Sequence, residues 1–409
     1  MSIKPPLLFL CHRIPFPPNK GDKIRSWNLL RYLCEHYRVY LGAFIDDPAD
    51  WAHTGAIEGI CAGCRFIGLT PHLAKLNSLS AFVTGRALSL PYYRSRRLRR
   101  WVEATVAEQQ IRRVLVYSSA MAQYATDQRL GFQRRVIDFV DVDSDKWRQY
   151  AQDKRWPMSW VYRREADYLF RYERHLAESF DACLFVSSAE AELFRQLAPE
   201  LARNIGHYNN GVDTDYFRPD PTLANPYPQG TTALVFTGAM DYWPNVDAVK
   251  WFAGQVLPRV REARPEVRFY VVGGKPAEAV RALAGETVVV TGRVDDVRPY
   301  VQYASAAVAP MRIARGIQNK VLEAMAMARP VVVSPQGLEG IDASPGAEVL
   351  LADGADEFVQ HTLAACSGMH PDIGRAARER VRADFVWEHN LPLVHGLLQT
   401  DTVTLREYA

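Results

Sequence analysis

Two cations and one carboxylate lie close together between Arg315 and Glu323, and their spacing suits a nucleotide. Apolar residues recur at helical spacing from Lys320 to Met327, so Lys320 and Glu323 project from one face of the first helical turns. Gly316 precedes them and lets the backbone approach a ligand. Arg315 and Lys320 could bind phosphate oxygens, and Glu323 could bind a ribose diol. The alternative is a surface loop with three solvated charges.

The flanking segments place this loop at the edge of a parallel sheet. Residues 304–310 form a short apolar strand ended by a proline, and residues 331–334 are β-branched enough for a buried strand. Arg329 and Pro330 would end the helix between them. A helix N-terminus beyond the carboxyl end of a strand is where open α/β sheets bind phosphates, because its free N–H groups attract anions.

Strands and helices alternate through the whole chain, which predicts an α/β protein with two parallel sheets. Further strands are expected at 7–11, 39–44, 65–69, 113–118, 135–140, 180–187, 233–238, 267–274 and 288–292. Residues 220–230 contain three prolines and little else that is apolar. We therefore predict a first domain at 1–218, a linker at 219–230, a second domain at 231–385, and a C-terminal helical segment at 386–409 that could cross back to the first domain.

The composition is that of a globular protein whose charge is unevenly spread. Of the 409 residues, 48% are hydrophobic and 23% charged. The sequence contains no run of 18 or more apolar residues, so we expect no transmembrane helix. Residues 1–218 carry 31 Lys and Arg against 24 Asp and Glu, whereas residues 219–409 carry 18 against 22. The basic first half suggests an anionic neighbour, such as lipid headgroups or an acidic acceptor, and nucleic acid is not an expected partner.

Two basic and aromatic stretches, at 91–101 and 147–164, support a contact with an anionic membrane surface. A solvated helix face is an equally good reading of such charge runs. Six cysteines form no disulfide framework, and the pair Cys61 and Cys64 lacks the second pair of a zinc site. We expect free thiols in a reducing compartment, hence a cytoplasmic protein that could lie on the inner membrane.

Three features in the second half resemble GT-B glycosyltransferases of the large family-four type. They are Asn210-Gly-Val-Asp213 followed by Phe217-Arg-Pro219; Phe236-Thr-Gly238 with Val271-Val-Gly-Gly274 and Val290-Thr-Gly292; and Gly316 with Lys320-Val-Leu-Glu-Ala-Met-Ala and Arg329-Pro-Val-Val. They follow one another in the family's order. The first-domain loop at 12–26 and residues 312–320 further resemble the sugar transferases that accompany exosortase (PEP-CTERM) systems in bacterial exopolysaccharide clusters.

The resemblance implies two Rossmann-like domains facing across a cleft, with the donor against the second and the acceptor against the first. It implies sugar transfer from a nucleotide-sugar of the UDP or GDP type to a lipid-linked or polysaccharide acceptor, with retention of configuration and neither cofactor nor metal. Arg315, Lys320 and Glu323 would be the catalytic residues. The donor-binding positions would be Gly238, Gly292, Arg293, Val294, Gly316, Ile317, Gln318 and Asn319.

This chain departs from the family pattern in three places. Glu323 matches the second Glu of the family's Glu-seven-residues-Glu motif, which binds ribose, but Arg315 stands at the first. Sugar choice and the catalytic arrangement therefore stay open. The loop at 238–245 lacks the Arg and Lys with which the family holds the diphosphate, so Arg315 and Lys320 are expected to take over that role. Residues 118–121 lack the family's first-domain His.

The candidates on the acceptor side are Lys20, Gly21 and Asp22 in the loop after the first strand, and Asp141 after the strand at 135–140. Carboxylates at strand ends could bind an acceptor, although loop Asp residues often only cap helices. Asp141 and Asp143 also have the spacing of a metal motif. We expect no metal there, because that loop lies in the domain opposite the donor.

Two other functions remain open. A nucleotide-sugar 2-epimerase shares the GT-B architecture, but it needs an acid and a base near the sugar, and the loops around Gly21 and Gly316 show no such pair. With Arg315 in place of the family's Glu, the chain could instead be a non-catalytic nucleotide-binding partner in a membrane-associated glycan assembly. Lys320 and Glu323 argue against such a loss of the nucleotide site.

Overall fold

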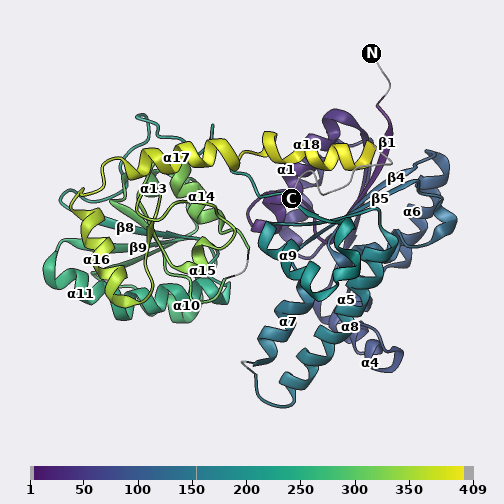
Figure 1. Ribbon diagram of the computed structural model, residues 1–409, viewed down its shortest axis with the longest axis horizontal. Coiled ribbons are helices and arrows are strands. Elements are labelled where there is room, and N and C mark those ends of the chain that lie inside the picture. Colours follow the sequence, from purple (N-terminus) through teal and green to yellow (C-terminus); the bar gives the residue numbers. More distant parts are fainter. Residues whose placement is uncertain (1–3, 153, 315, 400–409) are drawn as a thin grey trace. The chain divides into compact units, whose positions relative to one another are not determined.

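The computed structural model describes residues 4–152, 154–314 and 316–399, which form two compact units (Figure 1). The first unit runs to Asn209 and takes in the described residues from Leu391 onward, whereas the second holds Asn210–Asn390. Each unit is built on one sheet whose paired strands are all parallel, so the predicted α/β class is confirmed.

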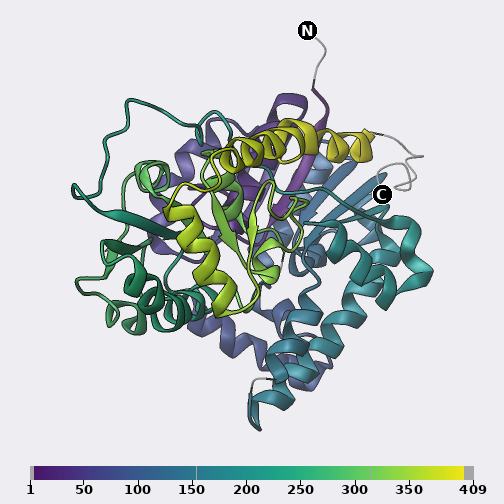
Figure 2. The same cartoon turned by 60° about the vertical axis from the view of Figure 1, so that its left-hand side comes forward.

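The first unit has a seven-stranded sheet in the order β3-β2-β1-β4-β5-β6-β7. Its strands are β1 (Pro6–Cys11), β2 (Arg38–Ile45), β3 (Gly63–Gly68), β4 (Arg113–Tyr117), β5 (Arg134–Val140), β6 (Ala182–Phe185) and β7 (Ile205–His207). Its helices are α1 (Gly21–His36), α2 (Thr54–Glu58), α3 (Pro71–Ser78), α4 (Ser80–Thr84), α5 (Ser89–Tyr92), α6 (Arg96–Glu108), α7 (Asp143–Gln152), α8 (Met158–Ser179), α9 (Ser188–Leu197) and, at the end of the described chain, α18 (Trp387–Gln399). Helices α6, α8 and α9 pack on one face, whereas α18 lies beside α1, with His36 and His395 in ring contact (Figures 1 and 2).

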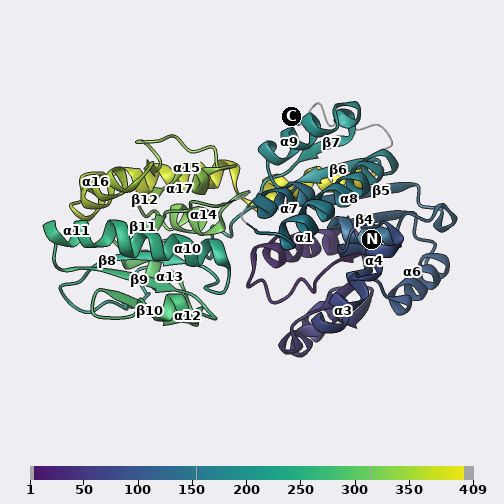
Figure 3. The same ribbon diagram turned by 90° about the horizontal axis from the view of Figure 1, so that it is seen from below.

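The second unit has a six-stranded sheet in the order β10-β9-β8-β11-β12-β13 (Figure 3). Its strands are β8 (Thr232–Thr237), β9 (Val267–Val272), β10 (Val288–Gly292), β11 (Ala306–Ala309), β12 (Val331–Val333) and β13 (Leu350–Leu351). Its helices are α10 (Trp243–Trp251), α11 (Leu257–Ala263), α12 (Glu278–Arg281), α13 (Arg298–Tyr303), α14 (Asn319–Ala326), α15 (Pro335–Leu338), α16 (Ala355–Cys366) and α17 (Ile373–Asp384). Helices α13, α14 and α17 cover one face of the sheet, and α10, α11 and α16 cover the other (Figure 1).

The division between the units differs from the predicted one. It falls at Asn209/Asn210 rather than after residue 218, and residues 219–230 pack onto the second unit. Tyr227 is buried there and its hydroxyl donates to the carbonyl of Tyr300, while Val212 joins the same core. The prolines made this segment look like a linker, although a few apolar residues anchor it to the second unit. No helix in the described part of the chain is long and apolar enough to cross a bilayer.

Candidate functional site

The strand order of the second sheet reverses between β8 and β11, and the loops after these strands therefore diverge at its carboxyl edge. Such a switch point is where open parallel sheets bind ligands. The loop after β8 begins at Gly238, and the segment after β11 leads through Gly316 into α14. The loops after β9 and β10 begin at Gly273 and Arg293. The glycine positions predicted as donor-binding thus gather at one edge of one sheet.

Two of these loops are in backbone contact. A Cβ atom on Gly273 would lie 1.7 Å from the carbonyl oxygen of Gly238, so no other residue fits there. The Gly273 N–H donates to the carbonyl of Gly292 at 3.1 Å, and the Gly238 N–H to that of Val272 at 3.1 Å. The ends of β8, β9 and β10 are therefore held as one rigid surface.

Lys320 rises from the first turn of α14 toward this edge. Its Nζ donates to Oδ1 of Asn245 at 3.1 Å and to Oε1 of Gln318 at 3.2 Å, and lies 5.2 Å from the ring centroid of Phe236. Each of these contacts is with a neutral group. Among the residues that the structure describes, no carboxylate forms an ion pair with Lys320, so its half-buried charge is not compensated in that way.

Glu323 lies one turn further along α14 and is also half-buried. Burial lowers the pKa of Lys320 to about 8, although the nearby Glu323 carboxylate acts in the opposite direction. Burial likewise raises the pKa of Glu323 to about 7, against the opposing effect of Lys320. The pKa of each group is thus shifted so that the neutral form is favoured, which is typical of a site that binds a charged or polar ligand.

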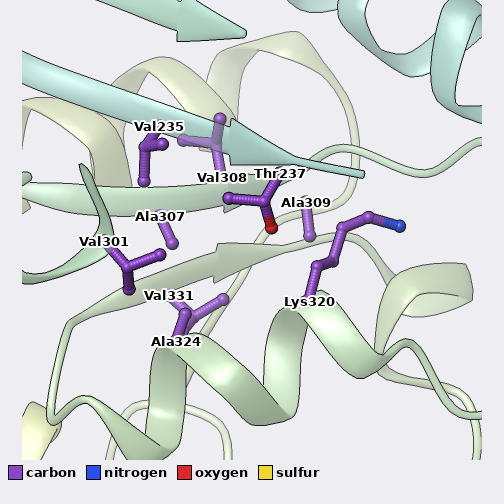
Figure 4. Close-up of a pocket in the computed structure, with 9 residues that line it drawn as sticks. All are labelled: Val235, Thr237, Val301, Ala307, Val308, Ala309, Lys320, Ala324 and Val331. Atoms are coloured by element: carbon purple, nitrogen blue, oxygen red, sulfur yellow. The ribbon is translucent and has the colours of Figure 1, made fainter. Parts of the chain in front are cut away.

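Beneath Lys320, a small and largely aliphatic pocket separates α14 from the strands (Figure 4). Its lining consists of Val235, Thr237, Val301, Ala307, Val308, Ala309, Lys320, Ala324 and Val331. In Figure 4 the ammonium of Lys320 points away from the aliphatic lining. Because phosphates and ribose need polar partners, a nucleotide suits the polar rim of this pocket and not its interior.

The remaining donor-side predictions lie around the same edge. Gly316 has a φ of 65°, a left-handed conformation that favours glycine, and its carbonyl accepts from Nε2 of Gln318 at 3.1 Å. Ile317 is buried in the core, and Arg293 is exposed just after β10. The remaining two are Asn319, whose Oδ1 lies 3.5 Å from Nδ2 of Asn210, and Val294, which packs on the core. Arg315 lies outside the described residues.

In the first unit, the loop after β1 is tied together by ion pairs. Arg13 binds both Asp22 and Asp46, and Nε2 of His12 lies 3.4 Å from Oδ2 of Asp22. Burial by itself would raise the pKa of Asp22, but the hydrogen bond from His12 and the charge of Arg13 lower it well below its usual value. Lys20 and Gly21, the other predicted residues of this loop, stand at the start of α1.

Asp141 follows β5 and pairs with Lys146, whose Nζ also lies 3.5 Å from Oδ1 of Asp143. Lys146 thus takes the place that a metal ion would need between these two carboxylates. Although burial opposes it, the charges of Asp141 and Asp143 raise the pKa of Lys146 well above its usual value. Behind them lies Glu173, whose pKa is raised to about 8 by burial and by Asp143.

Two side chains at these edges were not among the predicted site residues. Asn245 contacts Lys320 from the start of α10. The two residues are 75 positions apart in the sequence, so no local pattern indicates that they meet. His12 stacks on Tyr117 with ring centroids 5.8 Å apart, and its buried Nδ1 has no hydrogen-bond partner in the described part of the chain. His12 could have been predicted as a site residue, because it directly follows the first strand. Strands β1 and β4 form the switch point of the first sheet, where ligands bind.

Comparison with known proteins gives one family match and many similar solved structures. Residues 231–367, within the second unit, match a family described as glycosyl transferases group 1. A search of curated proteins gives no match.

Solved structures similar to this chain cover nearly its whole length. Sucrose-phosphate synthase from Thermosynechococcus elongatus is 17% identical, with a TM-score of 0.70 over 96% of this chain and 98% of the other. HepE of Anabaena in complex with UDP and glucose is 14% identical, with a TM-score of 0.68 over 96% and 99%. WaaG, a glycosyltransferase involved in lipopolysaccharide biosynthesis, is 14% identical, with a TM-score of 0.66 over 96% and 99%. The fold is therefore GT-B, and the match to a glycosyltransferase family is confined to residues 231–367.

Proposed function

We propose that this glycosyltransferase moves a sugar from a UDP- or GDP-sugar to a lipid-linked or polysaccharide acceptor in bacterial exopolysaccharide or envelope glycan synthesis. The observation that carries the proposal is Lys320. Its ammonium stands half-buried at the N-terminus of α14, among neutral acceptors, at the switch point of the second sheet. A nucleoside diphosphate supplies the negative charge that this position lacks.

Glu323 gives the nucleotide its second contact. A carboxylate whose pKa burial has raised to about 7 gains most from a ligand that donates hydrogen bonds to its charged form. The two hydroxyls of a ribose do so. Similar solved structures support this assignment, since HepE has been crystallised with UDP and with UDP-glucose.

The proposed reaction retains the configuration of the sugar. The bond from the anomeric carbon to the diphosphate oxygen breaks, and a bond to the acceptor oxygen forms on the same face. The acceptor's proton passes to the departing phosphate. Lys320, the α14 N-terminus and Arg315 would stabilise the charge that develops on the diphosphate, so no metal ion is needed for that step. The role of Arg315 rests on the sequence alone.

The finer parts of the proposal concern place and acceptor. The acceptor loop would include Lys20, Gly21, Asp22 and Asp141, which lie at the carboxyl edge of the first sheet. The resemblance to exosortase-associated transferases favours an exopolysaccharide, and WaaG, which acts in lipopolysaccharide synthesis, has the same fold. We place the enzyme in the cytoplasm, peripherally on the inner membrane, where a lipid-linked acceptor would be presented.

The test is a thermal-shift screen of the purified protein with UDP, GDP and their common sugars, first without metal and then with Mg²⁺. A ligand that binds only the native state raises the melting temperature. We expect a rise with one nucleotide in the absence of metal. A rise only with Mg²⁺ would refute metal independence, and no rise at all would refute the donor site.

A second measurement separates the remaining alternatives. The reaction with the donor so identified is followed by NMR of the anomeric proton. Retention is expected, and an inverted product would show that the departing phosphate is not the base. A binding-only protein would give the thermal shift with no turnover, whereas an epimerase would change the donor sugar without any acceptor.

A further inference from the structure

Helices α3 and α4 bury their small residues and expose their large ones. The positions that face the protein hold Ala74, Ser78 and Ala81. The exposed positions hold Leu73, Leu76, Leu79 and Val83, which are 60%, 63%, 56% and 91% exposed. A surface helix of a water-soluble domain shows the opposite arrangement, because its apolar stripe faces the core. Contiguous apolar exposure of this kind marks a contact surface.

The start of α8 extends this surface. Trp156, Met158 and Trp160 are exposed, and the ring of Trp160 stacks on that of Phe82 at 6.1 Å with 13° between the planes. Arg164 lies over the same Phe82 ring and donates to the carbonyl of Ala81 at 2.7 Å. Figure 1 shows α4 near α8, in agreement with these contacts of Phe82 and Ala81. We call this surface the apolar ridge, formed by Leu73, Leu76, Leu79, Phe82, Val83, Trp156, Met158 and Trp160.

The charge around the apolar ridge is predominantly positive. Residues 71–86 and 154–164 contain no Asp or Glu, and their cations are Lys75, Arg86, Lys154, Arg155, Arg163 and Arg164. Three acids flank these stretches: Asp153 lies outside the described residues, Asp167 is exposed, and Glu165 is buried and accepts the N–H groups of Leu88 and Ser89. These contacts fix its carboxylate inside the unit, so it does not compensate the positive surface.

The sequence predicted a membrane contact at 91–101 and at 147–164, and only the second stretch overlaps the apolar ridge. The aromatics of the first stretch turn inward, since Tyr93 and Trp101 both pack against the first unit's core. In the second, Trp147 packs on Tyr162 at 5.0 Å. The apolar part of the contact therefore lies at 73–83 and 156–160, and the first stretch contributes only charge.

We propose that the apolar ridge docks on an anionic phospholipid bilayer. Isolated aliphatic and Trp side chains that project into solvent suit insertion among acyl chains and headgroups, and the surrounding cations suit phosphate. The excess of positive charge favours an anionic bilayer over a protein partner, whose surface would carry both signs in similar number. The inference rests on the proposed function in one respect, because a lipid-linked acceptor explains why the enzyme needs this surface.

The test is flotation of the whole protein with vesicles of phosphatidylcholine alone and of phosphatidylcholine with phosphatidylglycerol, at low and high salt, without donor or acceptor. We expect binding only to the anionic vesicles, weakened by salt because the cations are screened. The variants Val83→Glu and Trp156→Ala should each lower the bound fraction about tenfold, since each removes apolar insertion. Both side chains are so exposed that the fold should be kept.

The matched control is Met369→Glu, which places the same charge at an exposed apolar side chain of the second unit and should bind like the wild type. Equal binding by all three variants would overturn the proposal, as would salt-insensitive binding to phosphatidylcholine. If sedimentation showed a dimer that Val83→Glu dissociates, the ridge would be a self-association surface instead. Nucleotide-induced thermal shifts, measured in parallel, should be unchanged in every variant, so failure here leaves the proposed function standing.

Discussion

The carboxyl edges of the two sheets differ in whether their charged side chains form ion pairs. At the first, Arg13 pairs with Asp22 and Asp46, and Lys146 pairs with Asp141, so each of these charges has a partner of opposite sign. At the second, burial without an ion pair shifts Lys320 and Glu323 toward neutrality. The ion pairs named at the first edge balance their charges within the protein, whereas the charge of Lys320 at the second edge is available to the proposed ligand.

The buried pair of Arg25 and Asp138 shows the first case most clearly. Nε of Arg25 donates to Oδ2 of Asp138 at 2.8 Å, and the guanidinium lies 3.5 Å from the ring centroid of Tyr208. Asp138→Ala should lower the free energy of unfolding by about 3–5 kcal/mol, because it leaves a buried cation unpaired. Urea denaturation measures this effect. The control is Arg129→Ala, which breaks an ion pair with Asp127 at an exposed side chain, keeps the backbone N–H that Asp127 caps, and should leave the transition unchanged.

In contrast to Asp138→Ala, Lys320→Ala should cause a large loss of activity with little loss of stability. We expect kcat to fall about 10²–10³-fold, as when one donor to a developing negative charge is removed. The nucleotide-induced thermal shift should also disappear. The control is Lys250→Ala, an exposed lysine of the same unit. If Lys320→Ala unfolded the protein while keeping turnover per folded molecule, the contrast between the two edges would be wrong.

Glu323→Gln should raise KM for the donor about tenfold with a small effect on kcat, because hydrogen bonds from ribose to a charged acceptor are lost. A 2′-deoxy donor provides the decisive comparison. The wild type should lose affinity for it, and the variant should discriminate little between the two donors. Equal discrimination by both enzymes would place the ribose elsewhere.

The smallest expected effect is on pH dependence. A diphosphate keeps its full charge above pH 7, but Lys320 loses its proton as pH rises through about 8. Nucleotide affinity should therefore fall about tenfold between pH 7 and 9, and Lys320→Arg should remove that fall. Isothermal titration calorimetry in buffers of different ionisation enthalpy would detect the proton taken up at pH 8.5, and its absence would contradict the assignment.

Without ligand, the pH dependence of folding stability is opposite to that of nucleotide affinity. The folded pKa of Lys320 lies below its unfolded value, so the unfolded chain binds more protons above pH 8. Charged Lys320 therefore opposes folding at neutral pH, and its contribution to stability should improve as pH rises past 8. The difference between wild type and Lys320→Met isolates this contribution in urea titrations across that range.

Local patterns sufficed for much of the second unit. The helix predicted from Lys320 is α14, which begins at Asn319, because its apolar spacing and the proline at 330 are contained in one short segment. The strands β7 and β13 were missed, since three and two residues carry too little periodicity. The order of the strands and the switch points that they create depend on pairing across the chain, which no local pattern records.

Which way a side chain faces was the least predictable feature. The aromatics at 91–101 resemble a membrane-facing belt in sequence, yet Trp101 packs against the core beside Gly42, whose missing side chain leaves room for it. Conversely, Leu73, Leu76 and Val83 look like an ordinary buried stripe and face outward. Amphipathic spacing identifies the two faces of a helix, but the neighbouring elements decide which one is covered.

The helix α18 begins in one unit and ends in the other, which has a consequence for synthesis on the ribosome. Arg113 and Arg134, on two strands of the first sheet, donate to the carbonyls of Leu398 and Leu397. These acceptors are translated only after the whole second unit. The first unit must therefore persist incomplete while the second is made, and a chain released before residue 391 would keep its donor site but leave both guanidiniums without these acceptors.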